Sequence, residues 1–254
     1  MAQSASVLMG ARANALGNAS ACLSDVWSLS NNIAGLAKTE RPAAGFAYHA
    51  VPYLKSFNRM AAVFAVPLKQ GVVGTSAFRF GDDLYNEHIL SLGFANTFGL
   101  ASLGIKANFV QYRGEGTPLH TAFTVSFGGI ATITKQLLFG AHVLNMNQPV
   151  INELTGERVP TRLVAGIALR PSDKLHVTAE IEKDLEYTPS FKAGFEYVFL
   201  KRIAFRTGFN FNPEAGFFGL GFKTGKFGLD YALQFNDPTG ISHQAAITWQ
   251  PAKL

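Results

Sequence analysis

Charged residues are scarce in this chain of 254 residues: Asp, Glu, Lys and Arg make up 15% of it, against roughly 25% in an average soluble protein. Long apolar runs are also missing, because Gly, Asn or a charged residue interrupts each one before the ~18 residues that a membrane-spanning helix requires. The first deficit leaves little charge for a soluble surface of this size, and the second excludes membrane helices. A transmembrane β-barrel tolerates both, because its apolar residues are spread over alternate positions of many strands.

Residues for bond-forming or metal chemistry are few. Cys22 is the single cysteine, so an internal disulfide is impossible, and no group of Cys and His has the spacing of metal ligands. Ser242 and His243 are neighbours in a period-two segment and point to opposite faces, which prevents a nucleophile–base pair. The glycine-rich segment 216–221 lacks a following Gly-Lys-Ser/Thr, so it is no phosphate-binding loop. We therefore expect a protein that is not an enzyme and has no cofactor.

Apolar residues are nevertheless abundant, at 48% of the chain with 22 Phe, and they alternate with small or polar residues as in β-strands. In residues 201–211 one face carries Phe205 and Phe209, and the other carries Ala204 and Arg206. The apolar faces carry no charge at mid-strand, where Lys or Arg facing lipid would cost about 2–4 kcal/mol. The opposite faces are rich in Gly, Ala and Asn, which fits a crowded lumen better than the surface of a soluble sandwich.

Fourteen strands are predicted, an even number as in bacterial single-chain barrels. They span residues 44–52, 60–69, 71–81, 87–97, 100–113, 120–130, 134–145, 160–170, 174–184, 189–199, 201–211, 214–224, 226–236 and 240–249. The turns after even-numbered strands are predicted to be short, and the connections after odd-numbered strands to be longer. Short periplasmic turns and longer outer loops alternate in this way when both termini are periplasmic.

Residues 1–42 differ from the rest, because they are rich in Ala, Ser and Asn and show little alternation. We divide the chain into an N-terminal plug segment, 1–42, and a transmembrane β-barrel, 43–254. A fourteen-stranded barrel has a lumen too wide for the wall side chains alone to fill, and the N-terminal segment is the one stretch outside the wall that is long enough to fill it. The opening residues 1–5 look like what remains after a signal peptide is removed.

Motifs at both ends of the chain resemble those of one known family. Near the N-terminus they are Gly10-Ala11-Arg12-Ala13, Ala15-Leu16-Gly17-Asn18-Ala19, Asp25 and Asn32-Ile33-Ala34-Gly35-Leu36-Ala37. Near the C-terminus they are Gly194-Phe195-Glu196-Tyr197, Arg206-Thr207-Gly208, Gly219-Leu220-Gly221, Asp230-Tyr231-Ala232 and Gly240-Ile241-Ser242-His243. Together they resemble the PorV/PorQ-like outer-membrane proteins of Bacteroidota, relatives of the FadL-type fourteen-stranded barrels. Ile33 replaces the proline that is usual in the family.

The resemblance implies that the N-terminal segment is a plug in the barrel lumen. Its plug motif would comprise Gly10, Arg12, Gly17, Asp25, Asn32 and Gly35. The predicted inward faces of neighbouring strands carry a second set of residues, a lumen charge network of Glu180, Glu182, Lys192, Glu196, Arg202, Arg206 and Asp230. These charges could form a conduction path or ligand site, or salt bridges that hold the plug to the wall. The near balance of signs favours salt bridges, because charges in a low-dielectric lumen pair with one another.

The resemblance further implies a protein of the bacterial outer membrane with both termini periplasmic. Its first implied function is that of a partner-binding component of a protein secretion or surface-attachment complex, associated with type IX secretion. Its partners would be outer-membrane lipid and other outer-membrane or secreted proteins. The alternative is a FadL-like transporter of hydrophobic small molecules, with Pro67, Gly71 and Gly74 as candidate disruptions of the wall. A nineteen-stranded porin of the mitochondrial type is disfavoured, because the strands are spaced too far apart along the sequence for nineteen of them to fit. Lys and Arg are scattered along the sequence, which indicates that nucleic acid is not a partner.

Overall fold

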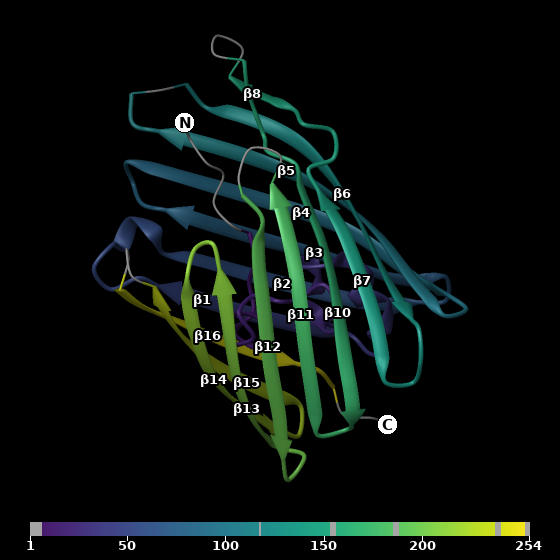
Figure 1. Cartoon of the computed structure of the whole chain (residues 1–254). Coiled ribbons are helices and arrows are strands. Elements are labelled where there is room, and N and C mark those ends of the chain that lie inside the picture. Colours follow the sequence, from purple (N-terminus) through teal and green to yellow (C-terminus); the bar gives the residue numbers. More distant parts are fainter. Residues whose placement is uncertain (1–6, 117, 153–155, 185–187, 237–239, 252–254) are drawn as a thin grey trace.

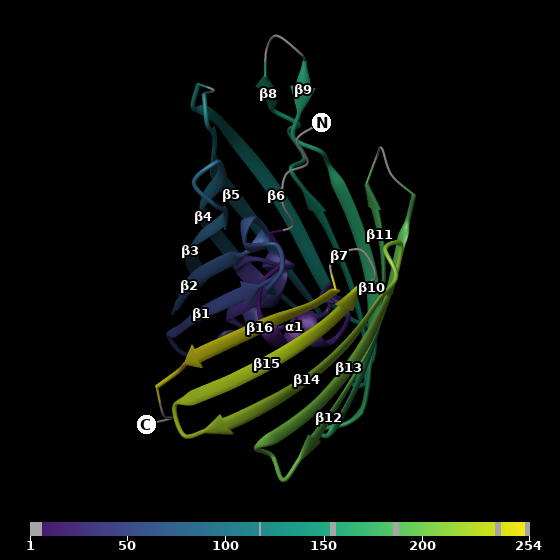
Figure 2. The same ribbon diagram turned by 90° about the vertical axis from the view of Figure 1, so that its left-hand side faces the viewer.

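The computed structural model describes residues 7–116, 118–152, 156–184, 188–236 and 240–251. Fourteen strands close into an antiparallel barrel around the N-terminal segment (Figures 1 and 2). The wall strands are β1 Ala43–Ala50, β2 Arg59–Leu68, β3 Gly71–Gly81, β4 Tyr85–Phe98, β5 Ala101–Gly114, β6 His120–Thr132, β7 Leu137–Leu144, β10 Arg162–Ser172, β11 Leu175–Asp184, β12 Ser190–Phe199, β13 Ile203–Phe211, β14 Ala215–Thr224, β15 Phe227–Asn236 and β16 Gly240–Trp249.

Closure of the wall depends on pairing between its first and last strands. β1 pairs with β16 from Ala44↔Trp249 to Ala50↔His243, and every other wall strand pairs with its neighbour along the chain. Closure leaves no wall strand with an unpaired edge, which a bilayer requires because lipid cannot satisfy backbone hydrogen bonds. No helix in the described part of the chain is long and apolar enough to cross a membrane.

The fourteen predicted strands are confirmed, with ends that agree with the prediction or differ from it by at most three residues. The connections largely follow the predicted alternation: turns such as 69–70, 99–100 and 225–226 lie at one end of the barrel, and the longest connection, 145–161, lies at the other. The turn 133–136 is an exception, because it is longer than the connections 82–84 and 212–214 at the other end. We call these the short-turn end and the loop end. The longest connection contains a hairpin that the sequence did not predict, β8 Val150–Asn152 and β9 Glu157–Arg158. The wall is continuous at Pro67, Gly71 and Gly74, since β2 and β3 stay paired through all three.

The side-chain alternation places apolar residues outside and small or polar residues inside. Phe205, Phe209, Phe195 and Leu229 are each between 42% and 51% exposed on the outer face. Ala204, which alternates with Phe205 on β13, is 8% exposed and faces inward. The outer surface is thus an apolar band of the kind that contacts lipid in membrane barrels.

The N-terminal segment lies inside the barrel and forms three short helical turns. These are α1 Ala11–Ala15, η1 Val26–Leu29 and η2 Ile33–Lys38, whereas η3 Lys55–Phe57 lies in the β1–β2 loop. Trp27, Leu29, Ile33 and Leu36 are at most 3% exposed and belong to one apolar cluster with inward residues of the wall. This internal packing explains how a stretch with few regular hydrogen bonds keeps a fixed structure.

Glycines of the wall leave the space that the plug occupies. At ten inward positions, a Cβ atom would lie between 2.0 and 3.1 Å from an atom of the plug, closer than non-bonded atoms can approach without displacement. We call this set the glycine belt; its members are Gly45, Gly74, Gly93, Gly104, Gly128, Gly140, Gly166, Gly194, Gly208 and Gly219. Because glycine has no side chain, backbone and side-chain atoms of the plug reach van der Waals contact with strands around most of the circumference.

The two ends of the described chain leave the barrel differently. β16 ends at the short-turn end, and β1 begins there, directly after the plug. Val7, the first described residue, instead packs on the loop-end side of the plug beside Val159 and Tyr112. Val7 and the start of β1 thus lie on opposite sides of the plug, because the plug crosses the lumen before it joins the wall. Residues 1–6 and 252–254 lie outside the described residues, and the periplasmic location of both termini stays a prediction.

Candidate functional site

The six plug-motif residues all act in the packing of the N-terminal segment. Gly10 has φ of 107° beside Trp27, and Gly17 has φ of 69° against the backbone of Phe209, so both need a left-handed backbone as well as space. A Cβ atom on Gly35 would lie 2.1 Å from Leu23 O. Arg12, Asp25 and Asn32 supply the polar contacts described below.

Asp25 and Asn32 fix the two turns that follow them. An Asp25 carboxylate oxygen accepts a hydrogen bond from Trp27 N at 2.9 Å, and Ser28 Oγ accepts one from Asp25 N at 3.3 Å, which together cap η1. Asn32 Nδ2 donates to Ala21 O within the plug and to Gly129 O of the wall, at 2.6 and 3.1 Å. Asn32 thus joins the plug to β6.

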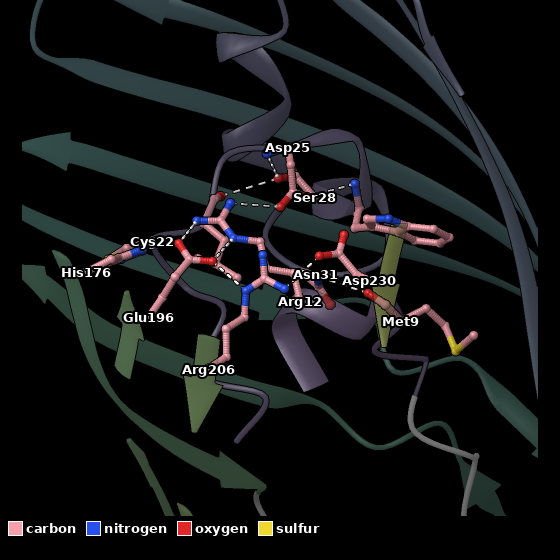
Figure 3. A network of polar contacts seen from close by, with 12 residues as sticks. Met9, Arg12, Cys22, Asp25, Ser28, Asn31, His176, Glu196, Arg206 and Asp230 are labelled. Carbon is pink, nitrogen blue, oxygen red and sulfur yellow. Dashed lines mark hydrogen bonds and ion pairs between the residues drawn. The ribbon is translucent and has the colours of Figure 1, made fainter. Parts of the chain in front are cut away.

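Arg12 joins the plug to another part of the wall. Its guanidinium donates to both carboxylate oxygens of Glu196 on β12, at 2.9 and 2.7 Å, and to Asp25 at 3.3 Å. Arg206 on β13 donates to Glu196 at 2.5 Å and to Asp230 on β15 at 2.6 Å. Figure 3 shows the two guanidinium groups on either side of the Glu196 carboxylate. Removing one partner from such a buried pair typically costs about 3–5 kcal/mol.

A second charged cluster holds the next part of the plug. Glu180 Oε2 on β11 accepts hydrogen bonds from the backbone N–H groups of Ser20 and Ala21, at 2.8 and 2.7 Å. Lys192 pairs with Glu180 at 3.0 Å and with Glu182, and Arg162 pairs with Glu182 at 3.5 Å. The carboxylate thus satisfies two plug donors that would otherwise be buried without partners.

The structure therefore places six of the seven charges that the sequence grouped in two clusters: Glu180, Glu182 and Lys192 in one, and Glu196, Arg206 and Asp230 in the other. Arg202 is not among them. It precedes the first residue of β13 and is exposed in the β12–β13 turn, where it lines the mouth of a cavity. Strand alternation does not extend into a turn, so it could not place this side chain correctly.

Lys106 is a lumen residue that the predicted network missed. It is 3% exposed, and its Nζ donates to Leu29 O of the plug at 2.8 Å. Its position between inward residues Gly104 and Asn108 of β5 was visible in the alternation. The carbonyl partner was not visible, because it belongs to a segment without periodicity.

Among the described residues, one cavity lies on each side of the plug. The cavity at the short-turn end has a volume of about 570 Å³ and reaches Arg12, Asp25 and Glu196. The cavity at the loop end has a volume of about 30 Å³ and lies between Val7, Leu29 and the wall. A volume of this size corresponds to about one water molecule. The plug and the wall thus leave little space around Val7 and Leu29 at the loop end, and they leave an open vestibule at the other end.

The loop-end half of the lumen is apolar over several strands. Phe78 on β3, Ile89 on β4 and Val110 and Tyr112 on β5 point inward and are between 3% and 7% exposed. Val159, from the long loop, covers them and is 2% exposed. Polar groups, including Lys106 and Asn108, lie between this apolar patch and the plug. The interior of a water-filled porin is polar instead.

Cys22 is a buried thiol in the plug. It is 1% exposed, and its Sγ lies 3.4 Å from Gly166 O of the wall. Burial raises the pKa of the Cys22 thiol from an ordinary 9.0 to about 12. The thiol is therefore protonated and unreactive while the plug is docked. Among the described residues, no group of His, Cys, Asp and Glu could hold a metal ion.

Comparison of sequences identifies no relative: no family model matches the chain, and no curated protein matches it. Solved structures do match. The toluene transporter TbuX of Ralstonia pickettii has a TM-score of 0.75 and 12% identity, over 95% of this chain and 98% of that chain. The toluene transporter TodX of Pseudomonas putida has a TM-score of 0.68 and 10% identity, over 99% of both chains.

A FadL homologue of Pseudomonas aeruginosa has a TM-score of 0.64 and 12% identity, over 98% of this chain and 99% of that chain. At this identity the likeness concerns the fold, and it extends over nearly the whole of each chain. The plug lies inside fourteen strands whose order matches their sequence order. This chain therefore has the fold of the FadL-like fourteen-stranded barrels.

Proposed function

We propose that this chain is a bacterial outer-membrane channel for small hydrophobic molecules and that its N-terminal plug keeps it closed at rest. The observation that carries the proposal is the apolar patch of Phe78, Ile89, Val110 and Tyr112 in the loop-end half of the lumen. An apolar solute gains free energy by leaving water for such a surface, at roughly 25 cal/mol per Å² buried. A hydrated ion would lose its hydration there without compensation.

The structural relatives support the same function. TbuX and TodX are described as toluene transporters, and CymD, with a TM-score of 0.75, is described as a monoaromatic hydrocarbon channel. The fold thus favours the hydrophobic transporter over the partner-binding component that the sequence placed first. A role in type IX secretion, with protein partners at the outer membrane, stays a prediction from the PorV/PorQ resemblance.

Entry of a solute requires movement, because the apolar patch is filled by the protein itself. Val7 and Val159 cover it, and the free volume of about 30 Å³ holds no hydrocarbon. A solute would enter from the loop end, replace these two side chains and then pass the plug towards the vestibule at the short-turn end. In this orientation the short turns face the periplasm, as in other outer-membrane barrels.

The test is uptake of a radiolabelled monoaromatic hydrocarbon by cells that carry the chain in an outer membrane without another hydrocarbon channel. Val110→Asn places a polar amide in the apolar patch and should lower uptake, whereas Val110→Leu preserves its apolar character and should retain most of it. A hydrophilic tetrasaccharide should not enter in either case. Equal hydrocarbon uptake by the two variants, or rapid entry of the sugar, would contradict the proposal.

A further inference from the structure

The turns at the short-turn end carry a concentration of positive charge. Exposed cations lie in or beside five of the six turns there, and we call them the basic collar: Lys69, Lys135, Lys174, Lys201, Arg202, Lys223 and Lys226. Asp173 is the exposed acid in the same turns, and Glu40 is exposed where the plug meets β1. None of the seven collar cations makes an ion pair within the described structure.

The described loops at the opposite end mix both signs. Lys55 and Arg158 are exposed there together with Asp83 and Glu115. The positive charge of the chain is therefore concentrated at one end of the barrel, even though Lys and Arg appear scattered along the sequence. This polarity is not explained by the contacts between plug and wall, because those contacts use buried charges.

Three of the seven collar cations directly adjoin the outer apolar band, and Lys201, Arg202, Lys223 and Lys226 also line the vestibule at the short-turn end. Lys69 follows Leu68, Lys201 follows Leu200, and Lys226 precedes Phe227; these apolar side chains are 54%, 70% and 46% exposed. A cation directly beyond the end of a lipid-facing surface lies at the depth of the lipid headgroups, where long Lys and Arg side chains extend toward the phosphates. The collar is thus placed at the boundary between acyl chains and water.

We propose that the basic collar binds the headgroups of anionic phospholipids in the leaflet at the short-turn end. The proposal rests on the membrane-spanning fold and is independent of the solute that the lumen carries. The distribution of the cations around the perimeter fits a continuous lipid surface better than a single acidic protein, which would contact one side. An anionic lipid surface strengthens attachment about fivefold for each nearby Lys or Arg.

The experiment is native mass spectrometry of the full chain in a non-ionic detergent, with equimolar phosphatidylglycerol and phosphatidylcholine of identical acyl chains. The wild type should retain phosphatidylglycerol at least tenfold more than phosphatidylcholine. The variant with Lys201→Gln, Arg202→Gln, Lys223→Gln and Lys226→Gln should lose most of this preference. The control with Lys55→Gln and Arg158→Gln at the loop end should keep it.

A second measurement uses only the wild type and so does not depend on the folding of a variant. Raising NaCl from 50 to 500 mM before detergent exchange into the spray buffer should reduce the phosphatidylglycerol preference, because salt screens exposed charges. Equal retention of the two lipids by the wild type would overturn the proposal, as would an equal loss in the loop-end control. Binding of a polyglutamate peptide without any lipid preference would also overturn it and assign the collar to an acidic protein.

Discussion

Replacing Gly140 by Ala should loosen the plug, because the glycine belt leaves no room for a methyl group at this position. A Cβ atom on Gly140 would lie 2.2 Å from Ala21 O and 3.0 Å from Cys22 Sγ. Ala21 O is held in place, because it accepts a hydrogen bond from Asn32 Nδ2 at 2.6 Å and the N–H of the same residue donates to Glu180 at 2.7 Å. Overpacking of this kind costs about 1–3 kcal/mol. Because this cost destabilises the docked state alone, the population of molecules with an undocked plug rises about 5- to 150-fold.

The buried thiol of Cys22 reports the docked state directly. With a pKa raised to about 12, its thiolate fraction at pH 8 is about a thousandfold below that of an ordinary thiol. Reaction with a bulky water-soluble maleimide therefore proceeds through the undocked plug. The labelling rate, followed by mass shift, should rise by the same 5- to 150-fold in the Gly140→Ala variant.

Gly216→Ala is the matched control. Gly216 lies on β14, and a Cβ atom there would have no neighbour within 4 Å, so this variant should label at the wild-type rate. Heat-dependent electrophoretic migration checks that both barrels are closed. Labelling of Gly140→Ala at the wild-type rate would refute the reasoning, and so would rapid labelling of the wild type.

Three further outcomes follow from the same structure. Phe205→Arg should impair insertion into lipid vesicles far more than Ala204→Ser, because a cation on the lipid face costs about 2–4 kcal/mol; equal insertion yields would reverse the assignment of faces. Glu196→Gln should make Arg12 accessible to trypsin in the folded barrel, because the buried pairing is lost; unchanged protection of Arg12 would show that the salt bridge does not hold the plug. Deletion of residues 1–42 should raise single-channel conductance in planar bilayers, and no increase would mean that another element closes the lumen.

The wall could be predicted from the sequence because strand alternation is a local property. Each segment shows its outward Phe or Leu and its inward Gly or Ala without reference to any other strand. The hairpin of β8 and β9 escaped prediction because strands of three and two residues are too short to show a period. Arg202 was misplaced for a related reason, since it lies one residue before β13 begins.

The contacts between plug and wall could be predicted only in part. Arg12 and Glu196 belong to motifs that the family resemblance identified, but their pairing over 184 positions depends on how far neighbouring strands are displaced along the barrel axis. The positions of the glycine belt depend on the same displacement of strands along the barrel axis. Gly208 belongs to the inward face predicted for residues 201–211, yet its common level with Gly140 around the lumen follows from the register of the strands and not from either sequence position.

Single-channel conductance of the full-length chain in a planar bilayer tests most directly whether the barrel is a closed hydrophobic channel. The account predicts insertion without open-porin current steps in salt solution, because the plug reaches the wall through the glycine belt and the loop-end lumen carries an apolar patch. Hydrocarbon uptake by the same preparation should nevertheless be measurable. Stable ion conductance of the size of an open porin would contradict the account.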